Sequence, residues 1–308
     1  MEKEILIFGH KNPDTDSICS AMVKERLNKK NGHDSSVAVR LGNINKETQY
    51  VLNYLNLEAP ELKEEVAEGQ KVIMVDHNEF NQSIKGIEKA KILGVVDHHR
   101  IANFETSDPL YYTARPYGCT STILFQDFKG KGIEINREEA ILMASAIISD
   151  TLLLKSPTTT KHDEKALEEL EKIAGIDIKE YGLEMLKAGT DLDDFTAKEL
   201  INLDAKELDK NGIKFVIGQV NTVDIPSVLE RQEELEKAIE EELKEKELAL
   251  FVLAITDILN SNSEILVLGE KSSVVEKAFD KKLENNRAFL EGVVSRKKQL
   301  LPNIDKNI

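Results

Sequence analysis

The chain has 308 residues, of which 41% are hydrophobic and 31% are charged, and its formal net charge is −15. This length is long for one domain and suits two, with enough apolar residues to build cores without disulfide support. The negative charge argues against a general affinity for nucleic acid, which needs a basic surface.

The few cysteines and the short apolar runs predict the compartment. Cys19 and Cys119 are too few for a disulfide framework and suit a reducing environment. No signal-peptide pattern opens the sequence, and the longest apolar run, residues 248–256, is too short to cross a membrane. We therefore expect a soluble, cytoplasmic protein without a membrane partner.

The first part of the chain alternates expected strands with expected helices. Apolar or alternating runs predict strands at residues 5–8, 36–40, 71–76 and 91–96 and a short edge strand at 110–113. Helical spacing occurs at residues 17–31, 48–57, 137–149 and 163–174. Because the strands are nearly continuous apolar runs separated by helices, they predict a mainly parallel sheet with helices on both faces.

A shift to glycine and polar residues at 189–194 predicts a linker between two domains, residues 1–188 and residues 195–308. In the second domain we expect strands at 213–220, 248–256 and 264–268, a strand-like segment at 292–294 and one long charged helix at 226–246. Pro226 fits the first turn of that helix, where its missing N–H costs nothing. The expected architecture is a smaller α/β domain with a mixed sheet.

Imidazole and carboxylate side chains follow several of the expected elements. They are His10, Asp14 and Asp16 after the first strand, then Asp76, then Asp97, His98 and His99, and finally Asp150 after an apolar helix. In an open parallel sheet the carboxyl ends of the strands border one crevice, so these side chains should converge. A single aspartate after a strand is equally well explained as a turn or cap residue, and only the combination favours a site.

The combination is typical of a centre with two metal ions. Four carboxylates held close together would repel one another and raise their pKa values unless cations neutralised them. Two divalent cations would balance the four expected carboxylates, and histidine and aspartate without cysteine suit Mn²⁺, Co²⁺ or Zn²⁺. His98 and His99 are neighbours, so in an extended chain their rings would point to opposite sides.

Three motifs carry a family resemblance. Gly-His-Lys-Asn-Pro-Asp-Thr-Asp-Ser at residues 9–17 and Val-Val-Asp-His-His-Arg at residues 95–100 resemble the Asp-His-His phosphoesterase superfamily. Val-Ser-Arg-Lys-Lys-Gln at residues 294–299 narrows the resemblance to the family II inorganic pyrophosphatases. The resemblance extends over essentially the whole chain and includes the segment at residues 116–121.

The resemblance implies a set of ligands and a reaction. Two Mn²⁺ (or Co²⁺) ions would be bridged by Asp76, with His10 and Asp14 completing one shell and Asp16, His98 and Asp150 the other. A water or hydroxide shared by the metals would attack inorganic pyrophosphate and yield two phosphates, with an additional Mg²⁺ arriving with the substrate.

Other residues receive substrate-binding roles from the same resemblance. Arg296 and Lys297 would close over the phosphates, Lys206 would contact them as well, and His99 would hydrogen-bond the substrate and help to protonate the leaving phosphate. By itself, a run of cations near the end of a chain more often forms a basic surface patch. Closure of the second domain over the substrate is also expected, as is a homodimer formed through the N-terminal domain near residues 110–113.

Two alternatives stay open. Another phosphoesterase of the superfamily, an exopolyphosphatase above all, would use the same metal ligands and cations. A nuclease-like member would carry a Gly-Gly-Gly-His motif, which this sequence lacks. A non-catalytic metal-binding or phosphate-binding regulator on the same scaffold would usually lack at least one ligand, whereas all six are present.

Overall fold

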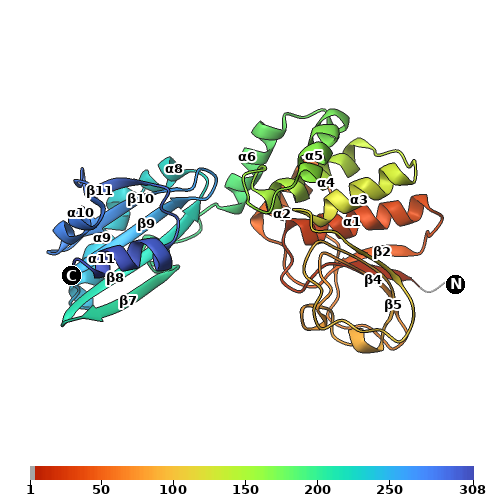
Figure 1. Cartoon of the computed structure of the whole chain (residues 1–308), viewed down its shortest axis with the longest axis horizontal. Helices are drawn as coiled ribbons and strands as arrows, with labels where there is room; N and C mark the ends of the chain where they lie inside the picture. Colours follow the sequence, from red (N-terminus) through yellow and green to blue (C-terminus); the bar gives the residue numbers. More distant parts are fainter. Residues whose placement is uncertain (1–3) are drawn as a thin grey trace. The chain divides into compact units, whose positions relative to one another are not determined.

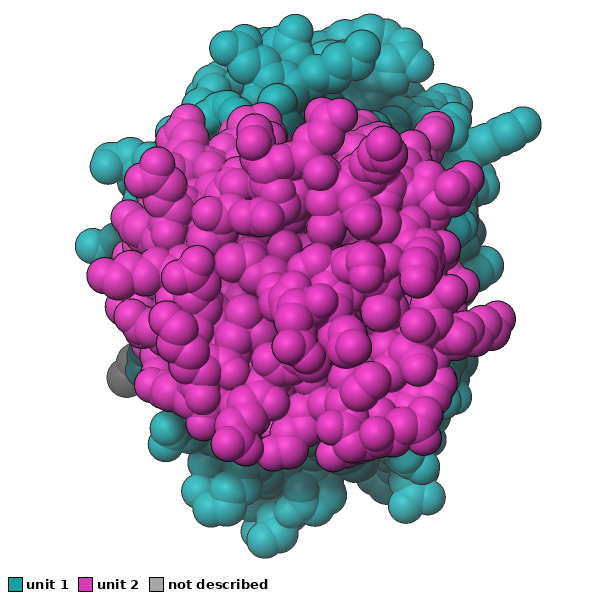
Figure 2. Space-filling model, turned by 90° about the vertical axis from the view of Figure 1, so that its left-hand side faces the viewer, with its two compact units in different colours: residues 1–189 teal, residues 190–308 magenta. Residues whose placement is uncertain are grey.

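The computed structural model describes residues 4–308. The chain divides into two compact units, residues 1–189 and residues 190–308, which are coloured separately in Figure 2. Each unit has its own sheet (Figure 1). Among residues 4–308, no helix combines the length and the apolar character that crossing a membrane requires.

The first unit is built on six parallel strands. They are β1 (Ile5–Phe8), β2 (Ser36–Arg40), β3 (Glu61–Leu62), β4 (Lys71–Val75), β5 (Lys91–Asp97) and β6 (Tyr111–Ala114). Their order in the sheet is β3-β2-β1-β4-β5-β6, and every neighbouring pair is parallel. From β1 the chain adds β2 and β3 on one side of the sheet. It then crosses to the other side of β1 and adds β4, β5 and β6 there. Ligand crevices of open α/β sheets occur at such a reversal of strand order.

The two faces of this sheet are covered differently. The α-helices are α1 (Thr15–Lys30), α2 (Lys46–Leu55), α3 (Thr120–Gly130), α4 (Arg137–Thr151), α5 (Lys161–Ala174) and α6 (Ile178–Gly189). Helices α1 and α3 contact the strands, and α4 packs against both of these helices (Figure 1). On the other face, Phe8 and Met74 pack with residues of the short 3₁₀ helices η1 (Phe80–Gln82) and η2 (Ile87–Lys89) and their flanking loops.

The junction of β1 and α1 is tighter than the sequence predicts. Helix α1 begins at Thr15, two residues earlier than expected, because Asp14 caps it: the Asp14 carboxylate accepts a hydrogen bond from the Ser17 N–H at 2.9 Å. Asp16 therefore lies in the first turn of a helix and not in a loop. A Cβ atom at Gly9 would lie only 1.8 Å from Ser17 Oγ, so only glycine fits this turn.

The second unit holds a five-stranded mixed sheet, as expected. Its strands are β7 (Ala205–Lys210), β8 (Ile213–Thr222), β9 (Leu250–Asp257), β10 (Asn262–Leu268) and β11 (Arg287–Glu291). Their order is β11-β10-β9-β8-β7, with β8 and β9 parallel and the other pairs antiparallel. One core packs against α7 (Ala197–Asn202), α8 (Ile225–Leu229) and α9 (Gln232–Glu245). The other packs against α10 (Ser272–Phe279) and α11 (Leu301–Asp305).

Two predictions for this unit are wrong. The expected long helix at 226–246 is divided into α8 and α9, because the backbone at Arg231 leaves the helical region (φ −96°, ψ 15°). The Arg231 guanidinium there donates hydrogen bonds to the backbone oxygens of Leu192 (3.2 Å) and Phe195 (2.8 Å). The strand-like segment at 292–294 forms no strand, because β11 ends at Glu291 and Gly292 turns the chain with φ +70°.

Candidate active site

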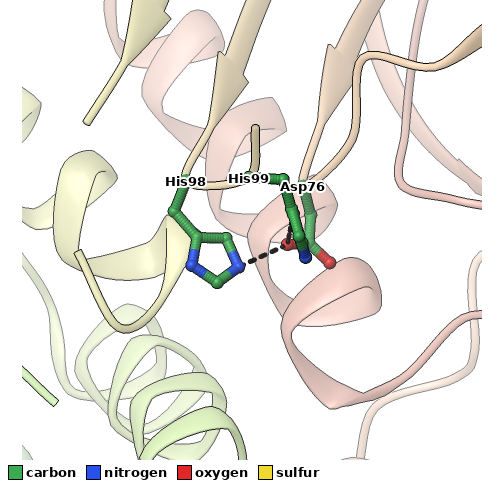
Figure 3. A group of neighbouring side chains, drawn as sticks. All are labelled: Asp76, His98 and His99. Carbon is green, nitrogen blue, oxygen red and sulfur yellow. Dashed lines mark ion pairs between the residues drawn. The ribbon is translucent and has the colours of Figure 1, made fainter. Parts of the chain in front are cut away.

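Three neighbouring strands of the first unit deliver His10, Asp76 and His98 to the same edge of the sheet. Asp76 follows β4, which lies between β1 and β5, so its carboxylate is placed between the two imidazoles. The Nε2 atom of His10 lies 3.4 Å from Asp76 Oδ2. The Nε2 atom of His98 lies 3.3 Å from Asp76 Oδ1, as Figure 3 shows. Each oxygen of Asp76 thus faces a different histidine.

Further carboxylates and His99 divide the cluster into three groups that share Asp76. Within each group, one nitrogen or oxygen atom from every residue lies within 4.8 Å of the others. Two of the groups are His10, Asp14 and Asp76, and Asp16, Asp76, His98 and Asp150; the third is Asp76, His98 and His99. The first two groups are the same residues as in the two ligand sets that the sequence predicts, and their binding of metal stays a prediction.

Two carboxylate oxygens of the cluster fit bound cations. Asp76 Oδ2 and Asp150 Oδ2 are buried and accept no hydrogen bond from the described residues. The nearest described partners are imidazoles, with His10 Nε2 3.4 Å from Asp76 Oδ2 and His98 Nε2 3.7 Å from Asp150 Oδ2. A buried carboxylate oxygen without a hydrogen bond is costly unless a cation, either a protonated imidazole or a metal ion, neutralises it. Asp76 is also held at φ 58°, an unusual value for a residue with a side chain. Its N–H donates to the Val96 oxygen at 2.9 Å, which fixes this conformation.

The segment that leads into α3 positions ligands of the second group, and the sequence interpretation assigned it no role. The N–H groups of Thr120 and Ser121 donate to the Asp16 carboxylate at 2.8 and 3.3 Å. Thr120 Oγ1 donates to Asp76 Oδ1 at 3.1 Å, and the backbone oxygen of Tyr117 lies 3.0 Å from His98 Nδ1. The only sequence signal for this segment was its place in the family resemblance.

The rings of His98 and His99 do not point to opposite sides, as they would in an extended chain. Strand β5 ends at Asp97, so the alternation of side chains does not continue into the two histidines. Their ring centres lie 4.2 Å apart, and His99 Nδ1 lies 3.7 Å from Asp76 Oδ1 (Figure 3). The same nitrogen lies 3.0 Å from Asp97 Oδ1. Asp97 is buried and accepts a hydrogen bond from Asn78 Nδ2 at 2.6 Å. The side chain of His99 is 51% exposed and lines a pocket of about 580 Å³.

The charges of the cluster are balanced by protons when no cation is present. Burial opposes protonation of His10 and His98, but the Asp14 and Asp76 carboxylates raise the pKa of His10 to about 10, and Asp76 and Asp16 raise the pKa of His98 to about 9. Burial and the nearby Asp76 raise the pKa of Asp16 to about 6. Burial and Asp16 raise the pKa of Asp150 well above its usual range.

We therefore expect Mn²⁺ binding to release protons and to tighten as the pH rises from about 6 to about 9. An imidazole binds a metal only in its neutral form, and His10 and His98 are protonated below pKa values of about 10 and 9. Raising the pH removes protons that Mn²⁺ would otherwise displace, so affinity increases in that direction. Titration calorimetry in buffers of different ionisation enthalpy measures the protons released. An Mn²⁺ affinity independent of pH over this range would contradict the expectation.

The second unit brings its three predicted cations together. Lys206 on β7, and Arg296 and Lys297 on the π-helix η3 (Arg296–Leu300), line a pocket of about 320 Å³ with Leu208 and Leu301. The Arg296 guanidinium is already positioned, because Nη2 lies 2.9 Å from Asp204 Oδ1 and Nη1 donates to the Asp204 backbone oxygen at 3.0 Å.

The polar residues that flank these cations fix the backbone of residues 294–298 through hydrogen bonds. Gln299 Oε1 accepts hydrogen bonds from the N–H groups of Val294 and Ser295, both at 3.0 Å. Ser295 Oγ accepts one from the Lys298 N–H at 3.2 Å, and Gln219 Oε1 accepts one from the Arg296 N–H at 3.0 Å. The serine and glutamine of the motif therefore shape the backbone, while its arginine and first lysine face the pocket.

Comparison with known proteins decides the family. The model of the DHH family N-terminal domain matches residues 4–147, and the model of the DHHA2 domain matches residues 183–307. The manganese-dependent inorganic pyrophosphatase of Bacillus subtilis is 57% identical over 303 residues, which cover 98% of this chain and 97% of the relative. The chain belongs to the family of manganese-dependent inorganic pyrophosphatases.

Other similar proteins also align over nearly their whole length. A protein of Staphylococcus carnosus named "Probable manganese-dependent inorganic pyrophosphatase" is 58% identical over 298 residues, 97% of each chain. A solved structure described as "Methanococcus jannaschii putative family II inorganic pyrophosphatase" aligns over 98% of this chain and 99% of its own with a TM-score of 0.62 and 41% identity. The family resemblance found in the three sequence motifs is therefore confirmed.

Proposed function

We propose that this protein hydrolyses inorganic pyrophosphate to two orthophosphates. The observation that carries the proposal is the pair of ligand groups joined through Asp76, in a chain whose relatives are named manganese-dependent inorganic pyrophosphatases. Pyrophosphate is an anion with several charges, so its binding needs cations from both metal ions and side chains. Candidates for both kinds of group support the proposal: the two groups joined through Asp76 on the first unit, and on the second unit the pocket lined by Lys206, Arg296 and Lys297, here called the basic pocket.

The six residues of the two groups hold the metal ions in this proposal. His10, Asp14 and Asp76 bind one Mn²⁺, and Asp16, Asp76, His98 and Asp150 bind the other. Bound divalent cations lower the pKa of a water molecule and neutralise charge on phosphate oxygens. The nitrogen and oxygen donors suit Co²⁺ as well, and an additional Mg²⁺ enters with the substrate.

The basic pocket supplies the side chains that bind the phosphates. Arg296 offers two parallel N–H donors to phosphate oxygens, while Lys206 and Lys297 act as point charges. These fixed donors stabilise the charge that develops on the transferring and leaving phosphates.

His99 is proposed to hydrogen-bond the substrate and to protonate the leaving phosphate. The hydrogen bond to Asp97 raises the pKa of His99, which favours the protonated, donating form near neutral pH. His99→Ala should lower kcat about 100-fold, the lower end of what general acid catalysis contributes. His33→Ala, at an exposed histidine, is the control. Wild-type turnover of His99→Ala in a steady-state assay would exclude this role.

We also propose that turnover needs closure of the second unit over the substrate, because the metal ligands and the basic pocket belong to different units. Single proline substitutions across residues 190–194 should stiffen the connection and lower kcat several-fold at an unchanged unfolding temperature. Steady-state kinetics and thermal unfolding of each variant give the two quantities. Unchanged kinetics throughout the series would count against closure.

The assembly is proposed to be a homodimer formed at the free edge of the first sheet. Strand β6 is the last strand on its side, and the Tyr111 side chain on it is 89% exposed. A free edge strand can pair with a second copy of itself. Cys19 and Cys119 are buried and unpaired, which suits the proposed cytoplasmic location.

A substrate panel tests the proposed function. The Mn²⁺-loaded protein is assayed with pyrophosphate, tripolyphosphate, pApA and a nitrophenyl phosphate ester, and light scattering on the same preparation gives its molar mass. We expect pyrophosphate to have the highest kcat/KM and the mass to be that of a dimer. A preference for tripolyphosphate would favour an exopolyphosphatase, a preference for pApA would favour a nuclease-like member, and no hydrolysis at all would favour a non-catalytic regulator.

A further inference from the structure

Glu47 on α2 lies beside the metal ligands without belonging to either ligand group. Its Oε1 atom accepts a hydrogen bond from Thr15 Oγ1 at 2.6 Å and another from Ser149 Oγ. Thr15 lies between Asp14 and Asp16 in the sequence, and Ser149 directly precedes Asp150. One carboxylate oxygen therefore contacts the neighbours of three proposed ligands.

These two hydrogen bonds tie together elements that are distant in the sequence. Thr15 begins α1, and Ser149 lies in the last turn of α4. The Thr15 side chain is fully buried and also lies 3.1 Å from the hydroxyl of Thr48, which is again on α2. The start of α1 and the end of α4 are thus held at a fixed spacing by Glu47, and so are the aspartates that they carry.

The other side of Glu47 faces the backbone at the end of the first unit. A Cβ atom placed on Gly189 would lie 2.9 Å from Glu47 Cβ and 2.9 Å from Glu47 Oε2. Gly189 is the last residue of α6 and of the first unit. A side chain added at Gly189 would therefore require a shift of Glu47 or of this backbone.

We propose that Glu47 is a positioning residue that couples the backbone at Gly189 to both metal-ligand groups. In this proposal, a displacement at Gly189 moves the Glu47 carboxylate. Because that carboxylate is hydrogen-bonded to Thr15 and Ser149, the displacement reaches Asp14 and Asp16 through Thr15, and Asp150 through Ser149. The inference rests on the proposed metal binding but not on the identity of the substrate. Groups that hydrogen-bond a metal ligand directly commonly change metal affinity 10–100-fold when they are removed. Glu47 acts one residue further away, through Thr15 and Ser149, so we expect an effect at the lower end of this range.

Mn²⁺ binding without substrate tests the first half of the coupling. Glu47→Ala should weaken Mn²⁺ affinity about tenfold and alter the electron paramagnetic resonance spectrum of the bound Mn²⁺. Glu47→Gln should restore both, because its amide oxygen can still accept hydrogen bonds from the two hydroxyl groups. Glu58→Ala, at an exposed glutamate beyond α2, is the control. If Glu47→Ala does not fold, Ser149→Ala takes its place, with a weaker affinity expected. Wild-type affinity in the variant tested would overturn the proposal.

A double-mutant cycle tests the second half. Gly189→Ala should weaken Mn²⁺ affinity, whereas Gly130→Ala should not, because a Cβ atom at Gly130 meets nothing within 4 Å. In the Glu47→Ala background, or in the Ser149→Ala background, the Gly189→Ala change should have a smaller effect or none. If Gly189→Ala weakens Mn²⁺ affinity by the same factor in the wild-type protein and in the mutant background, the coupling is overturned. Mn²⁺ binding is measured without pyrophosphate, so this result stands apart from any failure of the proposed hydrolysis.

Discussion

Asp76→Asn is expected to lower pyrophosphate hydrolysis by more than about 100-fold and to leave fewer than two Mn²⁺ per chain. Asp76 is the one residue common to both ligand groups, so its charge acts on both metal sites. Loss of a residue that merely supports a metal ligand costs 10–100-fold, and loss of a shared ligand should cost more. Asparagine tolerates the left-handed backbone at position 76, so the fold should survive the substitution.

Asp280→Asn is a closely matched control for Asp76→Asn. Asp280 also has a positive φ, 50°, but it is exposed and caps α10 in the second unit. Metal content by elemental analysis and steady-state kinetics should be those of the wild type in this variant. Two tightly bound Mn²⁺ and undiminished turnover in Asp76→Asn would exclude the shared-ligand role.

Arg296→Ala is expected to lower kcat/KM about 100-fold or more while Mn²⁺ affinity stays at the wild-type value. Arg296 lines the basic pocket and is oriented by the carboxylate and backbone oxygen of Asp204. Removing one preorganised donor that stabilises developing charge typically costs about 10²–10³ in rate. Arg296→Lys should recover only part of the loss, because an ammonium group cannot form the bidentate contact.

Lys298→Ala is the control for this substitution. Lys298 is exposed and follows the same turn, but it does not line the basic pocket. Its side chain should therefore be dispensable for turnover. Steady-state kinetics and Mn²⁺ titration on the three variants separate substrate binding from metal binding. A wild-type kcat/KM in Arg296→Ala would remove Arg296 from the proposed mechanism.

Much of the first unit follows from simple patterns in the sequence. The apolar runs that end at Asp76 and before Asp97 predict buried strands β4 and β5, and the structure places these strands side by side. Local propensity alone does not bring the residues of the site together. That step needs the rule that ligands of open α/β sheets bind at the carboxyl ends of the strands. Given that rule, the convergence of His10, Asp76 and His98 was predictable.

The finer geometry was not predictable, because it depends on contacts between residues distant in the sequence. Nothing local indicates that Thr120 donates hydrogen bonds to both Asp16 and Asp76. The break between α8 and α9 depends on carbonyl oxygens at Leu192 and Phe195, more than thirty residues before the arginine that binds them. Helical propensity and charge pairing favour a continuous helix there, but the hydrogen bonds of Arg231 to Leu192 and Phe195 accompany a break in the helix.

The central claim is that pyrophosphate hydrolysis depends on two metal ions held jointly by Asp76. Titrating the metal-free protein with Mn²⁺ while following pyrophosphate hydrolysis tests it most directly. We expect no significant turnover without metal and full turnover only when two Mn²⁺ are bound per chain. Full activity with one Mn²⁺ per chain, or a protein that binds two and releases no phosphate, would contradict the account.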